Sequence, residues 1–405
     1  MFELLLGLAF GIALGVFAGL LPGLHPNTLI PLLVGAAAYF DPLTAAVILV
    51  ATGITNSFVA FIPAILLGAP EDSEAMSALP GHRMLLAGRG YEAIKLTIIG
   101  GLGSVLLCLA LLPVLWFGFP AVYSATRPFL HWLLAALVAY MLLSEPVWKK
   151  AGWASLTFFL AGILGIIALD GFGDWTLFPM LTGLFGLPML LLSLKHRIKL
   201  PEHFSYESDP MPARSRLGGI AAGSAAGILV GLLPGIGSAQ ATVLAQEAVG
   251  RSKDTGTSDR TFLTAAGGVN AADSIYGLLA LWLVGNPRSG ISVAISQMAG
   301  MTSDSLLVII PALVAAAGIA AYITLKLART AVPLLRRIDY RRLNILVAGM
   351  LVVLVAFFSG SLGLVILTVS TAIGLIPNLT GIRRSHAMGC LLLPTILFFA
   401  GLTLF

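Results

Sequence analysis

Long apolar runs separated by short polar loops dominate this 405-residue chain. Charged residues make up 10% of it and apolar residues 58%, whereas soluble domains carry about 25% charged residues. In lipid, only helices and closed barrels satisfy their backbone hydrogen bonds, and a helix needs about 20 apolar residues to cross. The sequence therefore predicts an all-α polytopic membrane protein. The runs occupy residues 4–40, 43–70, 93–118, 129–147, 152–169, 175–194, 217–249, 261–285, 291–300, 304–328, 343–358, 361–377 and 387–405.

A pair of helix-breaking residues occurs twice within these runs. The sequence Gly-Leu-Leu-Pro-Gly stands at residues 19–23 and again at 231–235, 212 positions later. Proline removes a backbone donor and glycine weakens a helix, and in lipid no water replaces the lost hydrogen bonds. We therefore expect an internal repeat with broken or re-entrant helices. If each run supplies one span or two half-spans, the chain has about 10–14 membrane segments.

The basic loops predict how the two repeats are oriented. The polar stretch 195–216 carries five Lys and Arg residues, so the positive-inside rule makes it a cytoplasmic linker between a membrane repeat at 1–194 and a second at 217–405. The basic loop at 83–95 has a second-half counterpart at 286–303 with a single Arg. Corresponding loops thus face opposite sides, which predicts inverted-topology repeats in a multi-pass protein of the cytoplasmic membrane.

The two Pro-Gly turns form the predicted substrate site. Each turn could begin a half-helix, whose unpaired N–H groups and dipole attract anions. Two such helix starts facing each other from inverted repeats would favour a carboxylate or a phosphate. The alternative is a simple kink whose polar neighbours satisfy the freed backbone groups, but its repetition favours a site. The candidate substrate-binding residues are Pro22, Gly23, His25, Asn27 and Thr28, with Pro234, Gly235, Ser238, Gln240 and Thr242 in the second half.

A second pair of polar segments, each embedded in apolar sequence, predicts a site for a coupling ion. Asn56 and Asn270 are 214 positions apart, close to the displacement of the Pro-Gly turns. Oxygens of Asn and Thr, unwound carbonyls and the carboxylate of Asp273 are hard ligands for a small cation. Interhelical hydrogen bonding is the alternative, although an intramembrane carboxylate is usually functional. The candidates for binding sodium or a proton are Thr55, Asn56, Ser57, Asn270 and Asp273.

Several motifs resemble those of a known family. Both halves carry Leu-Pro-Gly followed by Leu or Ile, and the first half continues with Gly-Ala-Pro-Glu-Asp-Ser at 68–73 and Leu-Pro-Gly-His-Arg-Met at 79–84, then Gly88 and Gly90. Over most of its length the chain resembles the TctA permease family of tripartite tricarboxylate transporters. Residues 285–288, Gly-Asn-Pro-Arg, depart from the family's usual Gly-Ile-Pro-Gly.

The resemblance implies a secondary transporter for a di- or tricarboxylate-like organic anion, coupled to sodium or protons, with an elevator-type movement. It implies that Pro22, Gly23, Pro234 and Gly235 form the family's repeated turn. Its partners would be a small membrane subunit and an extracytoplasmic binding protein, besides the small anionic substrate and membrane lipid. We also expect a homo-oligomer.

Two other functions fit parts of the sequence. Facing helix starts would also suit the phosphate of a lipid carrier such as polyprenyl phosphate, and a lateral opening to lipid beside the turns would favour that alternative. Residues 171–174, Gly-Phe-Gly-Asp, match a pattern of intramembrane aspartyl proteases, but those enzymes need two close carboxylates, and no Tyr-Asp partner lies upstream in an apolar run. Nucleotide and zinc-protease motifs are absent. The sequence thus predicts neither an enzyme nor a cofactor, and no nucleic-acid partner.

Overall fold

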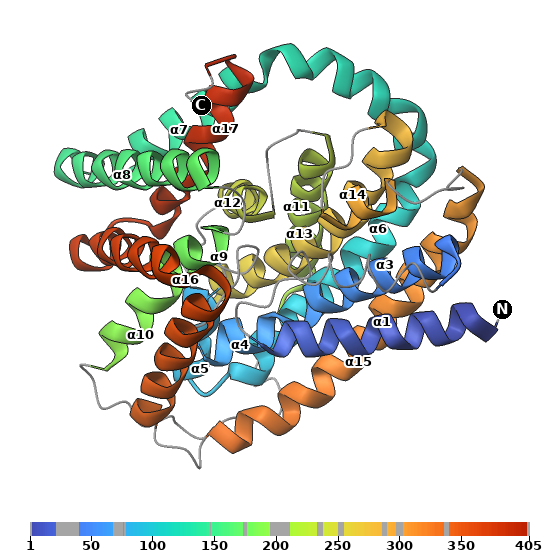
Figure 1. The fold of residues 1–405 in the computed structure, drawn as a ribbon, viewed down its shortest axis with the longest axis horizontal. Coiled ribbons are helices and arrows are strands. Elements are labelled where there is room, and N and C mark those ends of the chain that lie inside the picture. Colours follow the sequence, from blue (N-terminus) through green and yellow to red (C-terminus); the bar gives the residue numbers. More distant parts are fainter. Residues whose placement is uncertain are drawn as a thin grey trace.

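The structure is a computed structural model that describes residues 2–21, 40–67, 76, 78–145, 147–172, 176–194, 211–232, 238–249, 255–285, 290–296, 303–335 and 340–402. Nearly all of these residues lie in helices, and none of them forms a strand (Figure 1). Within this part of the chain, seven helices are long and apolar enough to cross a membrane. The prediction of an all-α polytopic membrane protein is confirmed.

Local sequence accounts for where the first-half helices begin and how they continue. Asp41 caps α3, because its Oδ1 accepts hydrogen bonds from the backbone N–H groups of Leu43 at 3.0 Å and Thr44 at 3.2 Å, and a proline occupies the first helical position. Helix α6 continues through Pro113 and Pro120, and Figure 1 draws it as a long curved arc. The first-half helices are α1 (Phe2–Leu20), α3 (Pro42–Val59), α4 (Phe61–Leu66), α5 (Ala78–Leu86), α6 (Gly90–Thr126), α7 (Leu130–Leu143), α8 (Trp148–Phe172), α9 (Leu177–Leu181) and α10 (Leu187–Ser193), with a π-helical turn at Thr182–Gly186 between the last two.

The second half repeats this mixture of long and broken helices. Helix α16 bends at Gly360, whose φ of 61° and ψ of −157° are not helical. Glycine adopts a positive φ without the steric cost that other residues meet. The bend therefore lies between the apolar runs at 343–358 and 361–377, as the sequence predicts. The second-half helices are α11 (Ala213–Leu232), α12 (Ser238–Val249), α13 (Thr255–Val284), α14 (Gly290–Ser296), α15 (Leu306–Leu335), α16 (Tyr340–Thr380), the 3-10 turn η5 (Arg384–Met388) and α17 (Gly389–Phe399).

The helices pack into two groups (Figure 1). We call α1, α3–α6 and α11–α15 the core unit, because these helices pack mainly on one another. We call α7–α10, α16, η5 and α17 the peripheral unit, which lies to the left in Figure 1. Both halves of the sequence therefore contribute to each unit, and the division into two membrane repeats stays a prediction.

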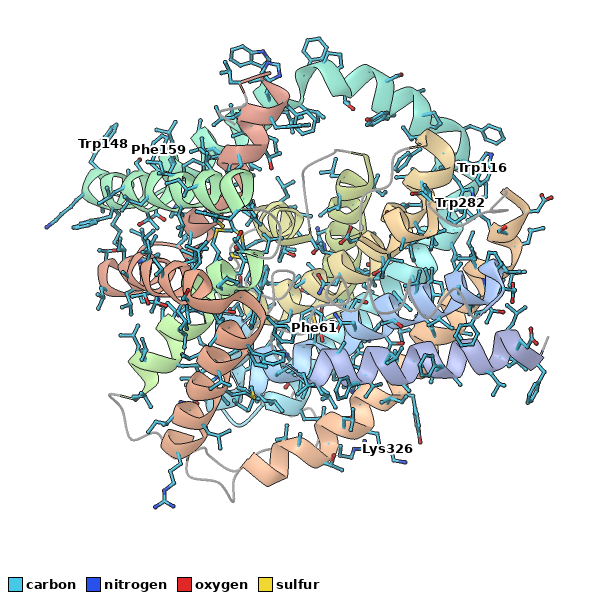
Figure 2. The ribbon with its side chains drawn as sticks, in the orientation of Figure 1. Phe61, Trp116, Trp148, Phe159, Trp282 and Lys326 are labelled. Carbon is cyan, nitrogen blue, oxygen red and sulfur yellow. The ribbon has the colours of Figure 1, made fainter. Side chains whose placement is uncertain are left out.

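The outer surface is apolar, as lipid contact requires. Trp148 and Phe159 of α8 point away from the protein, and Phe61 lies inside it (Figure 2). Trp148 is 87% exposed and Phe61 is 1% exposed. Exposed aromatic and aliphatic side chains of this kind are expected where lipid replaces water.

Helices α1 and α11 open the two halves with the same glycine spacing. Each carries four glycines at every fourth position, so that they share one face. A Cβ atom at Gly11 would lie 2.5 Å from the carbonyl oxygen of Ile48 on α3, and one at Gly219 would lie 2.8 Å from that of Thr261 on α13. Small residues thus let these helices approach to backbone contact. The eight glycines are Gly7, Gly11, Gly15 and Gly19 on α1, and Gly219, Gly223, Gly227 and Gly231 on α11.

In each half, one long helix packs on a helix of the other half. Helix α6 of the first half lies along α13, and α15 of the second half lies along α3. At the first of these contacts, a Cβ atom on Gly100 or Gly267 would overlap the facing backbone. The two halves are therefore interlocked. Of the predicted linker, residues 195–210 lie outside the described residues, while 213–216 already belong to α11.

Candidate functional site

The two Pro-Gly turns lie outside the described residues, but the helices that lead into them are described. Helix α1 ends at Leu20 and α11 at Leu232, each two residues before the proline of its Pro-Gly pair. Helices usually end at or before the residue preceding a proline, because the proline ring disfavours the helical conformation there. The predicted substrate residues outside the described part are Pro22, Gly23, His25, Asn27, Thr28, Pro234 and Gly235.

Helix α12 carries the substrate candidates that fall within the described residues. Ser238 is its first residue, and both Ser238 and Thr242 are buried. The hydroxyl of Thr242 donates to the carbonyl of Ser238 at 2.7 Å. Gln240 lies on the same helix, but its side chain is outside the described part. Helix α12 packs on α11 and α13, so its first turn lies inside the core unit.

The described part of α12 has the length of a half-helix. It has 12 residues, which extend about 18 Å at 1.5 Å per residue. The hydrocarbon core of a bilayer is about 30 Å thick. The described part of α12 is therefore shorter than one crossing, and a broken or re-entrant helix after Pro234 and Gly235 stays a prediction.

The coupling-ion candidates lie on α3 and α13, two helices that contact each other. Thr55, Asn56 and Asn270 are buried, at 0%, 4% and 3% exposure. The side-chain oxygens Oγ1 of Thr55 and Oδ1 of Asn56 have no hydrogen-bond partner among the described residues. A buried oxygen without a partner is costly and calls for an explanation, such as an ion or a water molecule. Two adjacent residues of α3 thus offer ligand atoms at the predicted position.

The other two candidates of this group are less enclosed. Ser57 is half-buried, and its hydroxyl donates to the carbonyl of Ile54 at 2.8 Å within α3. Asp273 on α13 is half-buried. Among the described residues, no group of three or more His, Cys, Asp and Glu side chains could hold a metal ion. The structure brings the five candidates onto two contacting helices, and their shared role stays a prediction.

A buried charge network joins the starts of α6 and α13, and the sequence does not indicate it. Glu92 pairs with Arg89 at 2.6 Å and also accepts a hydrogen bond from Nε of Arg260 at 2.6 Å. Glu92 and Arg260 are both buried. Nearby, Arg83 on α5 pairs with Asp259 on α13. Removing one partner from a buried ion pair is strongly destabilising, because the other charge stays behind uncompensated. This network therefore fastens α5 and α6 of the first half to α13 of the second.

A second polar cluster lies where the core and peripheral units meet. On the peripheral side, Glu145 Oε1 lies 2.9 Å from Nε2 of His386, 3.4 Å from the backbone N–H of Arg383 and 3.9 Å from Nε of Arg383. The guanidinium of Arg383 also pairs with Oε1 of Glu247 on α12. The hydroxyl of Tyr140 on α7 donates to Oε2 of Glu247 at 3.4 Å. Helix α12 is therefore bound to the peripheral unit through its last turn.

Glu145 lies in the loop between α7 and α8, where a carboxylate is ordinarily solvated. Its side chain is 4% exposed. Burial acts to raise the pKa of Glu145, but the hydrogen bonds from His386 and from the backbone of Arg383 outweigh it, so the pKa lies below its usual value. The partners of Glu145 are more than 230 positions away in the chain. Sequence reasoning missed them because no local pattern links the two segments.

Comparison with known proteins agrees with the motifs. The model of the tripartite tricarboxylate transporter TctA family matches residues 5–389. Among curated proteins, the uncharacterized protein MJ1079 of Methanocaldococcus jannaschii is 31% identical over 387 residues, which cover 93% of this chain and 94% of that protein. No solved structure gives a significant match.

Proposed function

Because this chain belongs to the tripartite tricarboxylate transporter TctA family, we propose that it carries a di- or tricarboxylate-like anion across the cytoplasmic membrane as a cation-coupled secondary transporter. Its family makes it the membrane component of a transport system, and its long apolar helices make it an integral membrane protein. The substrate, the coupling and the movement are the proposal. The single observation that carries it is the short helix α12, whose buried first turn follows the Pro234-Gly235 pair in the sequence.

An anion is the ligand that suits the start of α12. The first N–H groups of a helix have no intrahelical partner and form the positive end of its dipole. At this end of α12, Ser238 and Thr242 add hydroxyls that carry no charge. Such a site binds a carboxylate without a permanently buried cation, which would be expensive in the membrane. The matching turn at Pro22 and Gly23 supplies the second helix start in this proposal.

A cation bound between α3 and α13 would couple transport to an ion gradient. Thr55 and Asn56 offer two buried oxygens, and Asn270 and Asp273 lie on the contacting helix. Neutral oxygens of this kind can coordinate a sodium ion. A bound cation would also offset the negative charge of the substrate, so that each would favour the binding of the other.

The arrangement of the helices supports an elevator-type movement of inverted repeats. The glycine faces of α1 and α11 have the same spacing and lie 212 positions apart in the sequence. Helix α6 of the first half packs on α13 of the second, and α15 of the second half packs on α3 of the first. Related halves of opposite orientation can exchange two similar packings and so expose one site to either side. In our proposal the core unit moves relative to the peripheral unit.

Uptake by proteoliposomes tests the proposed function. The purified protein is reconstituted alone, and in parallel with a small membrane subunit and a binding protein from the same cells. We expect a labelled tricarboxylate to accumulate under an imposed sodium or proton gradient and not without one. Gly23→Val and Gly235→Val should abolish uptake while the protein remains monodisperse. Movement of polyprenyl phosphate without carboxylate uptake in either preparation would contradict the proposal and favour the lipid-linked substrate.

A further inference from the structure

Helix α12 of the core unit contacts the peripheral unit through its last turn. The turn η5 packs on α8 and α16 within the peripheral unit, and it also contacts α12 of the core unit. Arg383, which directly precedes η5, reaches across this contact to Glu247. An ion pair thus joins the helix that carries the substrate candidates to the unit that would stay in place.

Both oxygens of the Glu247 carboxylate are bound from the peripheral side. Oε1 pairs with the guanidinium of Arg383, and Oε2 accepts the hydroxyl of Tyr140 at 3.4 Å. Arg383 is in turn held by Glu145, which pairs with its Nε at 3.9 Å and accepts its backbone N–H at 3.4 Å. The guanidinium is therefore positioned by its own unit before it meets α12.

The position of Glu247 makes this ion pair matter for α12 itself. Helix α12 ends at Val249, so Glu247 places a negative charge in the last turn, at the negative end of the helix dipole. A carboxylate is unfavourable there unless a cation compensates it. The guanidinium of Arg383 supplies that compensation. Loss of the pair would therefore loosen α12 as well as the contact between the units.

We propose that the Arg383–Glu247 pair, with Tyr140, is an interlock that holds α12 against the peripheral unit in this conformation and opens when the core unit moves. The inference rests on the proposed transport function, because a pair that bridges a moving and a stationary unit cannot persist through the movement. Arg383 is a positioning residue, which acts on the substrate through α12. Arg83 and Asp259 form an ion pair too, but both lie in the core unit.

Hydrogen–deuterium exchange of residues 238–249 tests the interlock without any substrate. The variants are Glu247→Gln, Arg383→Gln and their combination, and the matched control is Arg83→Gln with Asp259→Asn. We expect each single change to raise the exchange rate of α12 roughly two- to fivefold, which corresponds to the stabilisation that a partly exposed ion pair provides. The combined change should do no more than either alone, because both remove the same contact. The control should leave exchange in α12 unchanged.

Charge reversal separates an interlock from a general loss of folding. Glu247→Arg combined with Arg383→Glu should bring exchange in α12 back toward the native rate, whereas each reversal alone should not. The proposal would be overturned if the effects of Glu247→Gln and Arg383→Gln on the exchange rate of α12 multiplied in the combined variant. It would also be overturned if the charge-reversed pair exchanged as fast as its single changes, or if the control variant raised the exchange rate of α12 equally.

Cross-linking tests whether the pair opens during transport. Glu247→Cys and Arg383→Cys are joined by a reducible bifunctional thiol reagent in proteoliposomes. Uptake should stop and then return on reduction, with the two single cysteine variants as controls. Full uptake by the cross-linked protein would overturn the proposal. If the native protein takes up no carboxylate at all, the proposed function fails, but the exchange measurements still decide whether Arg383 and Glu247 hold α12.

Discussion

At the scale of single residues, the buried oxygens of Thr55 and Asn56 are the feature with the clearest chemical consequence. Within the described part of the chain they lack hydrogen-bond partners, and leaving such groups unpaired costs about 1–3 kcal/mol each. A bound cation would remove that cost. If the protein bound its substrate without a cation, the cost of leaving these two oxygens unpaired would remain.

Asn56→Ala should weaken ion coupling more than substrate binding. Loss of one ligand oxygen is expected to raise the cation concentration that half-saturates uptake about tenfold, which corresponds to about 1.4 kcal/mol. Uptake measured at several sodium concentrations and several pH values checks this. Ser124→Ala is the matched control, because Ser124 is exposed and its hydroxyl donates to the carbonyl of Ala121 within α6. An unchanged cation dependence in Asn56→Ala would argue against the site.

Glu145 predicts how stability depends on pH. Its pKa is lowered in the folded protein, so the folded state favours the carboxylate and gains stability above the ordinary carboxyl pKa of 4.5. That gain is lost as the pH falls through the lowered pKa. Melting temperatures of the native protein and of Glu145→Gln should therefore differ at neutral pH and converge in acid. A difference that stays constant below pH 4.5 would contradict the assignment.

Residue-scale reasoning from sequence works where one segment contains the signal. The helix starts and ends near Asp41, Leu20 and Leu232 follow from caps and prolines that are local. The partners of Glu92 and Glu145 could not be predicted in this way. Arg260 is 168 positions away from Glu92, and His386 is 241 positions away from Glu145. No local pattern links such distant segments.

At the scale of elements, the glycine faces decide which helices touch. Gly223 of α11 lies against the backbone of Ala265 and Gly268 on α13, so no side chain fits there. We predict that Gly223→Val lowers the folded yield and the melting temperature, because overpacking costs about 1–3 kcal/mol or more. Gly152→Val is the control, since Gly152 of α8 faces open space. Comparable losses in both variants would mean that valine in a helix, and not the contact, is responsible.

The apolar runs predict the order of the elements well and their breaks in part. The bend at Gly360 and the short α12 agree with interruptions visible in the sequence. Helix α4 lies within the apolar run at 43–70, where a short helix has no pattern of its own. Helix α5 overlaps the stretch at 83–95 that the sequence predicts as a basic loop. The packing of α6 on α13 and of α15 on α3 could not be predicted from the sequence either, because hydropathy does not indicate which helices pack together.

At the scale of the whole molecule, the packing of α6 on α13 and of α15 on α3 predicts that neither half of the chain is stable alone. The glycine contact between α6 and α13 joins residues from opposite halves. Fragments 1–204 and 205–405, produced separately, should be degraded, whereas fragments produced together should be recovered as one complex. Affinity purification of a tag on one fragment, followed by detection of the other, measures this. A stable first fragment without its partner would contradict the interlocked arrangement.

The interlocked halves also constrain how the protein is made. During synthesis α6 enters the membrane before α13 exists, because more than 120 residues separate their ends. The face of α6 that packs on α13 therefore stays exposed to lipid or to the insertion machinery until the second half leaves the ribosome. Assembly is completed late, and a pause or truncation in the second half would strand a fully inserted but unpacked first half as a target for membrane proteases.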